Sequence, residues 1–345
     1  MTLQTLRQTA AERSAHFLDL WRKYAKNGRK SGTNSTCGLA ALYRKELADH
    51  LHSKRFILIF AILLIASSAS LGGAVSTLAS EGTGSSFVFL QLFTTGSGSI
   101  YSFATFIAFL GPLAGIILGF DAVSNERTLG TLNRLASQPI YRDAIINAKF
   151  LAGATVIVLI VFTLGIYVSA VGLMMIGVPP GVEEVLRIAA FLVLSAVYIA
   201  VWLAFALLFS VLCRHAATAA LACITIWLFL SLFMSLFASG IAGALFPLDG
   251  IEGVSNLMSN YQLELALNRI SPYYLFSEAA STILNPSVRS IGIVTMSSIQ
   301  GAVVGTLPFT QSLLLVWPHL VVMAALAAAG FAAAYIRFMR QEIRA

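Results

Sequence analysis

The sequence contains 345 residues, of which 58% are hydrophobic and only 11% are charged. Its mean hydropathy of +0.83 excludes a soluble globule, because so few polar residues cannot cover a folded domain in water. The formal charge of +7 does not indicate nucleic-acid binding, since the Lys and Arg residues collect beside long apolar stretches. We therefore expect an all-α membrane protein in a lipid bilayer, with no nucleic-acid partner.

Residues 1–37 are polar and basic and predict a cytoplasmic tail, because Lys and Arg favour the cytoplasmic side of a membrane. Residues 38–55 then place leucines such as Leu39, Leu42 and Leu47 on one face of a helix. This pattern predicts an amphipathic helix in the membrane interface before the first span. The interfacial residues that we single out on it are Tyr43, Arg44, Lys45 and Glu46.

Six apolar stretches are long enough for membrane-spanning helices. They are Phe56–Leu78, Ile100–Phe120, Phe150–Ile176, Val185–Leu212, Ala216–Leu245 and Ser312–Ile336. An even number of spans returns the C-terminus to the side of the N-terminus. With both termini cytoplasmic, only Arg187, Arg269 and Arg289 of the 22 basic residues lie outside, as the positive-inside tendency requires.

The longest connection, residues 246–311, is expected outside the membrane but has helical patterns of its own. Residues 256–284 are rich in apolar and aromatic side chains at helical spacing, and Pro272 would break one long helix there. We expect two short helices that meet near Ser271. Residues 291–307 are mildly apolar and predict either a partly inserted segment or a packed loop.

The other long connection, residues 121–149, lies between the second and third spans. It opens with Ser124 and Asn125, either of which can cap a helix, and Glu126 in the first turn favours the helix dipole. Leucines at 129, 132 and 135 supply one apolar face. The pattern predicts a surface helix at about 124–138, of a shape that docks into a groove on another protein.

This connection resembles the type-2 ABC exporter permeases. The resemblance is carried by Glu126-Arg127, Gly130-Thr131-Leu132, Ser137-Gln138-Pro139-Ile140, Arg142-Asp143 and Lys149-Phe150. The architecture agrees over residues 38–345, and we expect one six-span permease domain there. The resemblance implies that the surface helix couples to a separate ATPase, through Asn125, Glu126, Arg127, Leu129, Gly130, Thr131, Leu132 and Arg134.

In that interpretation Glu126 and Arg127 make polar contacts to the ATPase, and Leu129 and Leu132 pack beneath them. The alternative is that Glu126 and Arg127 are an ordinary helix-capping pair in solvent. The sequence has no G-x-x-x-x-G-K-[ST] motif, so ATP and Mg²⁺ are expected on the partner and no cofactor on this chain. No metal or catalytic motif is evident, and we expect a transport subunit and not an enzyme.

The family resemblance further implies two ATPase copies and a homodimer or heterodimer of permeases in a bacterial or archaeal cytoplasmic membrane. The spans carry almost no charge, which favours an apolar or amphipathic substrate. Residues that we single out as a possible pathway are Tyr101, Phe103 and Phe106. Small residues such as Gly115 and Gly119 suit close helix packing, including packing across a dimer interface. An ion-coupled secondary transporter or channel without an ATPase remains the alternative.

Overall fold

The computed structural model of the chain describes residues 38–81, 87–97, 100–131, 141–248, 253–286 and 307–341. The expected basic tail at 1–37, the stretch 291–306, and Leu132 and Arg134 lie outside the described residues. Apart from one isolated bridge between Ser97 and Ile100, the described residues form helices joined by turns. The prediction of an all-α protein is confirmed.

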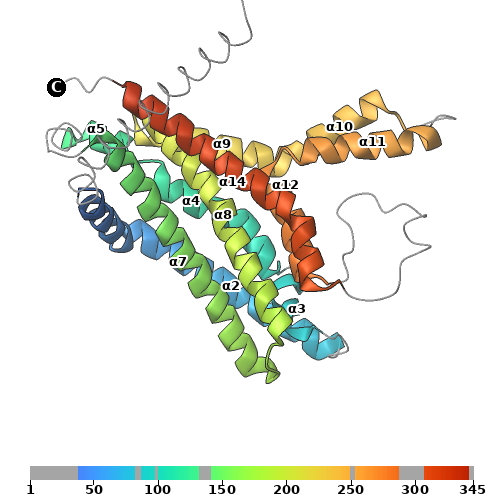
Figure 1. Cartoon of the computed structure of the whole chain (residues 1–345). Helices are drawn as coiled ribbons and strands as arrows, with labels where there is room; N and C mark the ends of the chain where they lie inside the picture. The colour runs from blue at the N-terminus through green and yellow to red at the C-terminus, as the bar shows by residue number, and fades with distance from the viewer. Residues whose placement is uncertain are drawn as a thin grey trace, which may run out of the picture.

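The described residues begin with an unlabelled helix at residues 38–51, which is the darkest blue helix of Figure 1. The helices that follow are α2 (Lys54–Glu81), α3 (Val88–Thr94), α4 (Phe103–Gly119), α5 (Ser124–Thr128), α7 (Arg142–Ile176), α8 (Val182–Leu212), α9 (Ala216–Leu228), the π-helix η1 (Phe229–Phe233), α10 (Met234–Leu245), α11 (Gly253–Asn268), α12 (Pro272–Leu284) and α14 (Phe309–Arg340).

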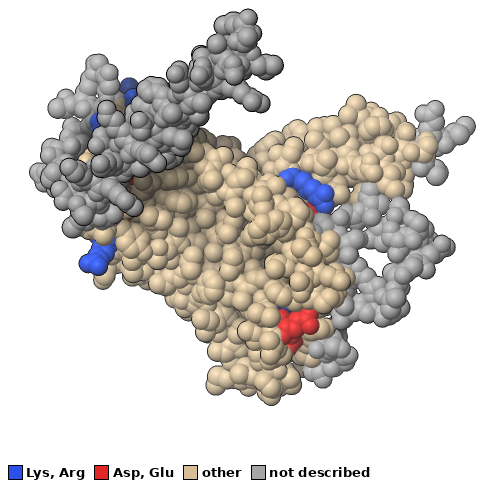
Figure 2. All heavy atoms as spheres, viewed as in Figure 1, with Lys and Arg blue, Asp and Glu red and all other residues tan. Residues whose placement is uncertain are grey.

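Six of the described helical stretches are long and apolar enough to cross a membrane. They are Lys54–Ser80, Phe103–Thr128, Arg142–Ile176, Val182–Leu212, Ala216–Leu245 and Phe309–Arg340. Figure 2 shows that uncharged side chains cover most of the described surface on the face in view, as contact with lipid requires. The six predicted spans are confirmed.

Helix α8 is the centre of the bundle, and α4, α7, α9, α12 and α14 all pack against it. In the most apolar part of α8, 72% of the residues are buried. In the most apolar part of the fifth span, which consists of α9, η1 and α10, only 11% of the residues are buried. The expected small residues of α4 face α8 within the same chain: a Cβ added at Gly115 would lie 2.6 Å from the carbonyl oxygen of Ile199. Gly115 and Gly119 therefore serve packing inside the chain.

Pro112 lies inside α4 and has no N–H to donate to the carbonyl of Ala108, one turn earlier. The hydroxyl group of Tyr198 in α8 donates to that carbonyl over 2.9 Å. Tyr198 is fully buried, so this hydrogen bond has no competition from water. The side chain from the neighbouring helix thus lets a proline stay inside a helix within an apolar core.

The two short helices expected around Ser271 are confirmed, since α11 ends at Asn268 and α12 begins at Pro272 with Ser271 as its N-cap. Their placement differs from the expected one. Helix α11 runs back along α10 (Figure 1), and Ser271 Oγ donates over 2.7 Å to the carbonyl of Leu230, in the middle of the fifth span. That carbonyl belongs to the π-helix η1, where the backbone bonding pattern changes.

Arg187 of α8 is fully buried and contacts both the end of α12 and the residues just before α14. Its guanidinium group donates to the carbonyl of Ile283 at the end of α12 over 2.8 Å and to the carbonyl of Leu307 over 2.6 Å. It also donates to Ser312 Oγ in α14 over 3.2 Å and pairs with Glu183. Arg187 therefore fixes where α12 ends and where α14 begins.

Candidate functional site

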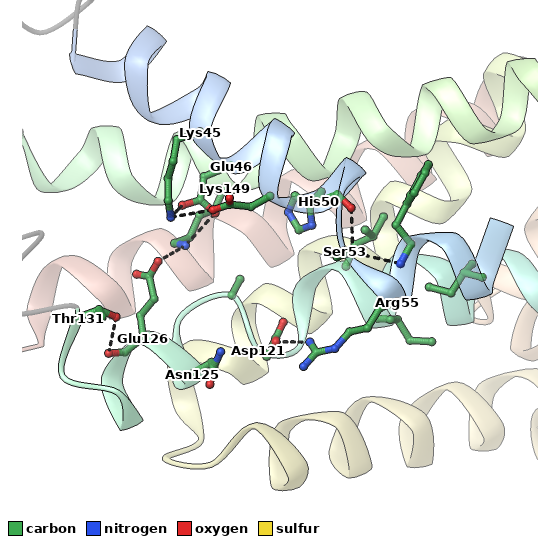
Figure 3. A pocket seen from close by; sticks show the side chains of 16 residues that line it. Lys45, Glu46, His50, Ser53, Arg55, Asp121, Asn125, Glu126, Thr131 and Lys149 are labelled. Carbon is green, nitrogen blue, oxygen red and sulfur yellow. Dashed lines mark hydrogen bonds and ion pairs between the residues drawn. The ribbon is translucent and has the colours of Figure 1, made fainter.

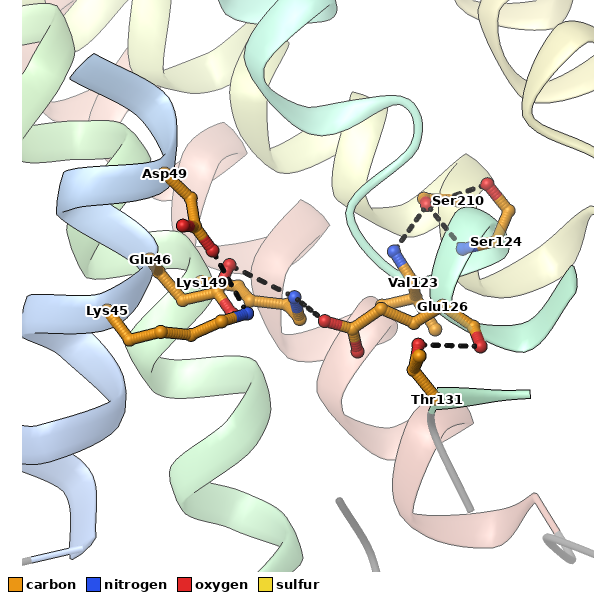
Figure 4. Close-up of polar contacts among 9 residues, drawn as sticks. All are labelled: Lys45, Glu46, Asp49, Val123, Ser124, Glu126, Thr131, Lys149 and Ser210. Atoms are coloured by element: carbon orange, nitrogen blue, oxygen red, sulfur yellow. Dashed lines mark hydrogen bonds and ion pairs between the residues drawn. The ribbon is translucent and has the colours of Figure 1, made fainter. Parts of the chain in front are cut away.

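A serine of α8 forms hydrogen bonds with the backbone at the start of helix α5. Ser210 Oγ accepts hydrogen bonds from the backbone N–H groups of Val123 at 2.9 Å and Ser124 at 3.1 Å. Figure 4 shows these contacts at the start of α5. The N-cap residue is Val123 and makes no side-chain cap, so the expected cap by Ser124 or Asn125 is wrong. The first free amides of this short helix are satisfied by a neighbouring span instead.

The surface helix expected at about 124–138 is interrupted soon after it begins. Helix α5 ends at Thr128, and Gly130 follows with a φ of +68°, a left-handed conformation that favours glycine. Thr131 Oγ1 turns back and donates to the carbonyl of Glu126 over 3.2 Å. Between Ser124 and Thr131 the chain therefore makes one helical turn and then a turn at Leu129 and Gly130, and residues 132–138 of the expected helix lie outside the described residues.

The side chain of Leu129 points away from the bundle and is 67% exposed. In this structure Leu129 does not pack beneath Glu126 and Arg127, and its expected role in contact with an ATPase stays a prediction. Beside it, a Cβ added at Gly130 would meet nothing within 4 Å. Among the described residues, this turn thus presents an exposed leucine next to a glycine without close neighbours, a combination that suits a docking surface.

Glu126 points inward and forms an ion pair with Lys149 of α7, with 2.8 Å between Oε1 and Nζ. The same Nζ atom lies 3.1 Å from Oε2 of Glu46 in the helix at 38–51. Lys149 is almost wholly buried, with a side-chain exposure of 3%. Figures 3 and 4 show its ammonium group between the two carboxylates. One buried cation thus joins three segments, which are α5, α7 and the helix at 38–51. Removal of either partner of an ion pair would leave a buried charge unpaired.

Burial alone would raise the pKa of Glu46, but the positive charge of Lys149, and then Lys45, lowers it further than burial raises it. Lys45 lies 3.0 Å from Glu46 and 3.1 Å from Asp49. The net result is a pKa of Glu46 below its usual value. The carboxylate therefore stays ionised and keeps its place beside Lys149 at neutral pH.

Arg127, the other half of the expected coupling pair, also turns toward the chain itself. Its guanidinium group donates to Gln341 Oε1 over 2.6 Å, at the end of α14. Gln341 in turn donates to the carbonyl of Val211 over 2.9 Å and accepts from Arg142 at its backbone carbonyl over 3.4 Å. Asn125 and Glu126 line a cavity between α5 and the helix at 38–51. The polar residues of α5 thus tie it to α7, α8 and α14.

The helix at 38–51 packs on this site through Leu42, which is buried with residues of α7, α8 and α14. The hydroxyl group of Tyr43 lies 3.0 Å from Thr155 Oγ1 of α7, and Arg44 is exposed. Glu46 is on the packed side, one helical turn after Leu42, and is only 7% exposed. In the sequence, the spacing of Glu46 four residues after Leu42 is a sign that this carboxylate lies on the apolar face of the helix.

The sequence pattern that defines the family described as "ABC-2 family transporter protein" matches residues 40–343, nearly the whole chain. The chain belongs to the ABC-2 transporter family. Two relatives carry the name "Probable ABC transporter permease protein NosY". The first, from Pseudomonas aeruginosa (strain PAO1), is 29% identical over 164 residues, which are 46% of this chain and 55% of the relative. The second, from Stutzerimonas stutzeri, is 33% identical over 143 residues, 40% of this chain and 47% of the relative.

The chain thus spans about half the length of these curated relatives. Membership of the ABC-2 family identifies this chain as a membrane-spanning permease component of an ABC transporter. The predicted family and the predicted class of function are confirmed.

Of the three residues that we expected along a pathway, Tyr101 and Phe106 lie together, whereas Phe103 lies in the core. Tyr101 is 66% exposed, and its ring meets Phe106 edge to face with 6.4 Å between centroids. Phe103 is fully buried, with Phe93 and Phe191 against its ring. Phe103 is therefore part of the packed core in this structure, and the expectation that it lines a pathway does not hold for this conformation. Tyr101 and Phe106 stay candidates.

Proposed function

We propose that this ABC-2 permease is the membrane-spanning subunit of an exporter that moves an apolar or amphipathic substrate. Two permeases, identical or similar, would pair in a cytoplasmic membrane with both termini in the cytoplasm. Two ATPase subunits, which carry the ATP and Mg²⁺, would attach at the α5 end. The observation that carries the proposal is the orientation of α5, which is bonded inward by its polar side chains and presents Leu129 outward.

This orientation supports two separate roles for the α5 segment, with one side for the ATPase and the other for the membrane spans. Leu129 enters an apolar groove of the ATPase, as an exposed apolar side chain on a short helix does in many docking contacts. Glu126 and Ser210 hold the other side of α5 to α7 and α8. A displacement of the ATPase then moves α5 together with these two spans, which is what a shift between inward-open and outward-open states requires.

The test compares Leu129→Ser with Leu248→Ser, a matched change of an exposed leucine near the far end of the fifth span. We expect Leu129→Ser to reduce co-purification of the ATPase and substrate-stimulated ATP hydrolysis about tenfold, the effect of removing one interface anchor. Leu248→Ser should retain the wild-type amount of bound ATPase.

Equal ATPase binding by both variants and the wild type would contradict docking through Leu129. Transport that continues in ATP-depleted vesicles and follows an ion gradient would instead support the secondary-transporter alternative, which predicts no dependence on an ATPase.

A further inference from the structure

A cavity of about 500 Å³ lies between the helix at 38–51 and helices α2, α4, α5 and α7. Its volume is within the range of small-molecule sites in proteins. Figure 3 shows the charged and polar side chains that point into it from these segments. The ion pairs of Lys149 form one side of the cavity and the contact of Arg55 with Asp121 forms another.

Among the residues that the structure describes, the lining of the cavity has more negative than positive groups. Four carboxylates line it, those of Glu46, Asp49, Asp121 and Glu126, against the three cations Lys45, Arg55 and Lys149. Each cation is already bonded to at least one of these carboxylates. Burial lowers the pKa of His50, the remaining titratable group of the lining, more than Glu46 raises it, so His50 is neutral at pH 7.

One carboxylate oxygen still lacks a donor. Glu126 Oε2 is buried and accepts no hydrogen bond within the part of the chain that the structure describes. An unpaired acceptor and an excess negative charge both favour a ligand that brings a cation with N–H groups. An anionic ligand would meet net repulsion, because the cations are neutralised where they stand.

The opposite wall is apolar. Phe56 and Ile59 come from the first turns of α2, and Ile117 and Leu118 come from the last turns of α4. These are the ends of the first two spans, where the side chains pass from membrane to interface. The cavity is therefore charged on one side and apolar on the other, and it lies at the boundary between membrane and interface. The head group of an amphipathic molecule lies at the same boundary.

We infer that this cavity binds an amphipathic molecule with a primary amine, its ammonium group among the carboxylates and its apolar chain along Phe56 and Ile117. A bare metal ion does not fit, because no three His, Cys, Asp or Glu groups in the described residues are arranged to hold one. The amine-bearing molecule has two sources: an aminophospholipid of the membrane, or transported cargo. The cargo case rests on the proposed function.

The first experiment uses the purified full chain without an ATPase. Native mass spectrometry would measure binding of three lipids with the same acyl chains: phosphatidylethanolamine, phosphatidylcholine and phosphatidylglycerol. We expect phosphatidylethanolamine to bind about tenfold more tightly than phosphatidylcholine, whose ammonium group has no N–H, and phosphatidylglycerol to bind most weakly. Equal binding of the three lipids, or a preference for phosphatidylglycerol, would overturn the inference.

Two variants locate the site. Asp121→Asn and the more exposed Asp49→Asn each remove one negative charge from the lining, and each should reduce the preference for phosphatidylethanolamine severalfold. Asp143→Asn is the matched control, because Asp143 bonds to the backbone of Ala144 and does not line the cavity. A preference that survives both lining changes, or that falls equally in the control, would place the amine elsewhere and overturn the inference.

The second experiment separates the two sources in vesicles that contain the permease with its ATPase. Dodecylamine is compared with dodecanol for stimulation of ATP hydrolysis. Stimulation by the amine alone identifies cargo, whereas amine-selective lipid binding without stimulation identifies a bound membrane lipid. Stimulation by both compounds alike would contradict amine selectivity at this site. Since the lipid-binding measurement needs no ATPase, failure of the exporter proposal would leave its result readable.

Discussion

Lys149 Nζ lies 2.8 Å from Glu126 Oε1 and 3.1 Å from Glu46 Oε2, so one ammonium group of α7 holds both α5 and the helix at 38–51. The three charged groups are far apart in the sequence and close in space. Their burial makes the arrangement sensitive to the loss of any one charge, and more so to the loss of the central one.

Lys149→Met is expected to lower the stability of the permease by about 3–5 kcal/mol, because two buried carboxylates lose their common cation. Glu126→Gln should cost less, since Lys149 keeps Glu46. The measurement is thermal unfolding in detergent. The triple variant Glu46→Gln, Lys149→Met, Glu126→Gln should recover most of the loss; a triple variant as unstable as Lys149→Met alone would show that the charges are not the cause.

Ser210→Ala removes the acceptor for the N–H groups of Val123 and Ser124. We expect a loss of about 1–3 kcal/mol and faster hydrogen exchange at the start of α5. The control is Ser195→Ala in the same helix, a buried serine whose Oγ donates to the carbonyl of Phe191, and it should change neither quantity appreciably. Unchanged exchange at α5 in Ser210→Ala would refute the role of Ser210 as its cap.

Tyr198→Phe should destabilise the permease by about 1–3 kcal/mol, because the carbonyl of Ala108 then has no donor. Pro112→Ala supplies the missing backbone N–H, so the tyrosine change should cost less in that background. A double-mutant cycle of unfolding free energies measures the difference. Additive effects of the two changes would mean that Tyr198 does not compensate for the proline.

Acid should weaken the hold of α12 on α14. Glu278 of α12 lies 2.8 Å from Nε2 of His319 in α14. Burial raises the pKa of Glu278, but hydrogen bonds from His319 and then Arg269 lower it further, to below its ordinary value of 4.5. Glu278 therefore stabilises the fold above about pH 4.5, and this contribution is lost as the pH falls through the lowered pKa.

Thermal unfolding between pH 7 and pH 3 tests this prediction. Glu278→Gln should be less stable than the wild type at pH 7 and should lose less stability in acid. Glu264→Gln in α11, which is outside the Glu278 network, should follow the wild-type curve. Parallel pH curves for Glu278→Gln and the wild type would rule Glu278 out as the titrating group.

The number of spans and the break at Ser271 and Pro272 could be predicted because composition and proline act locally along the chain. The ion pairs of Lys149 could not, since Glu46 and Lys149 are brought together only by tertiary packing. For the same reason the sequence placed Leu129 beneath α5: helical spacing shows that a face is apolar, but only the positions of Ser210 and Lys149 decide which face turns inward.

Tertiary packing also explains the placement of α11. Its apolar pattern could be read as a helix, but its return along α10 is accompanied by a hydrogen bond from Ser271 to the carbonyl of Leu230 in η1. No local pattern in residues 256–284 identifies that carbonyl, which is 41 positions away in the sequence.

The π-helix η1 acts as one extra residue in the fifth span, and one residue of an α-helix turns the chain by about 100°. The stripes of side chains on α9 and α10 are therefore rotated relative to those of an unbroken helix. This matches their neighbours, since α9 packs against α8 and α4 while α10 packs against α11. The two halves of the fifth span therefore pack against different neighbours, α9 in one half of the membrane and α10 in the other. A partner helix that lay straight along this span would contact a different face of it in each half.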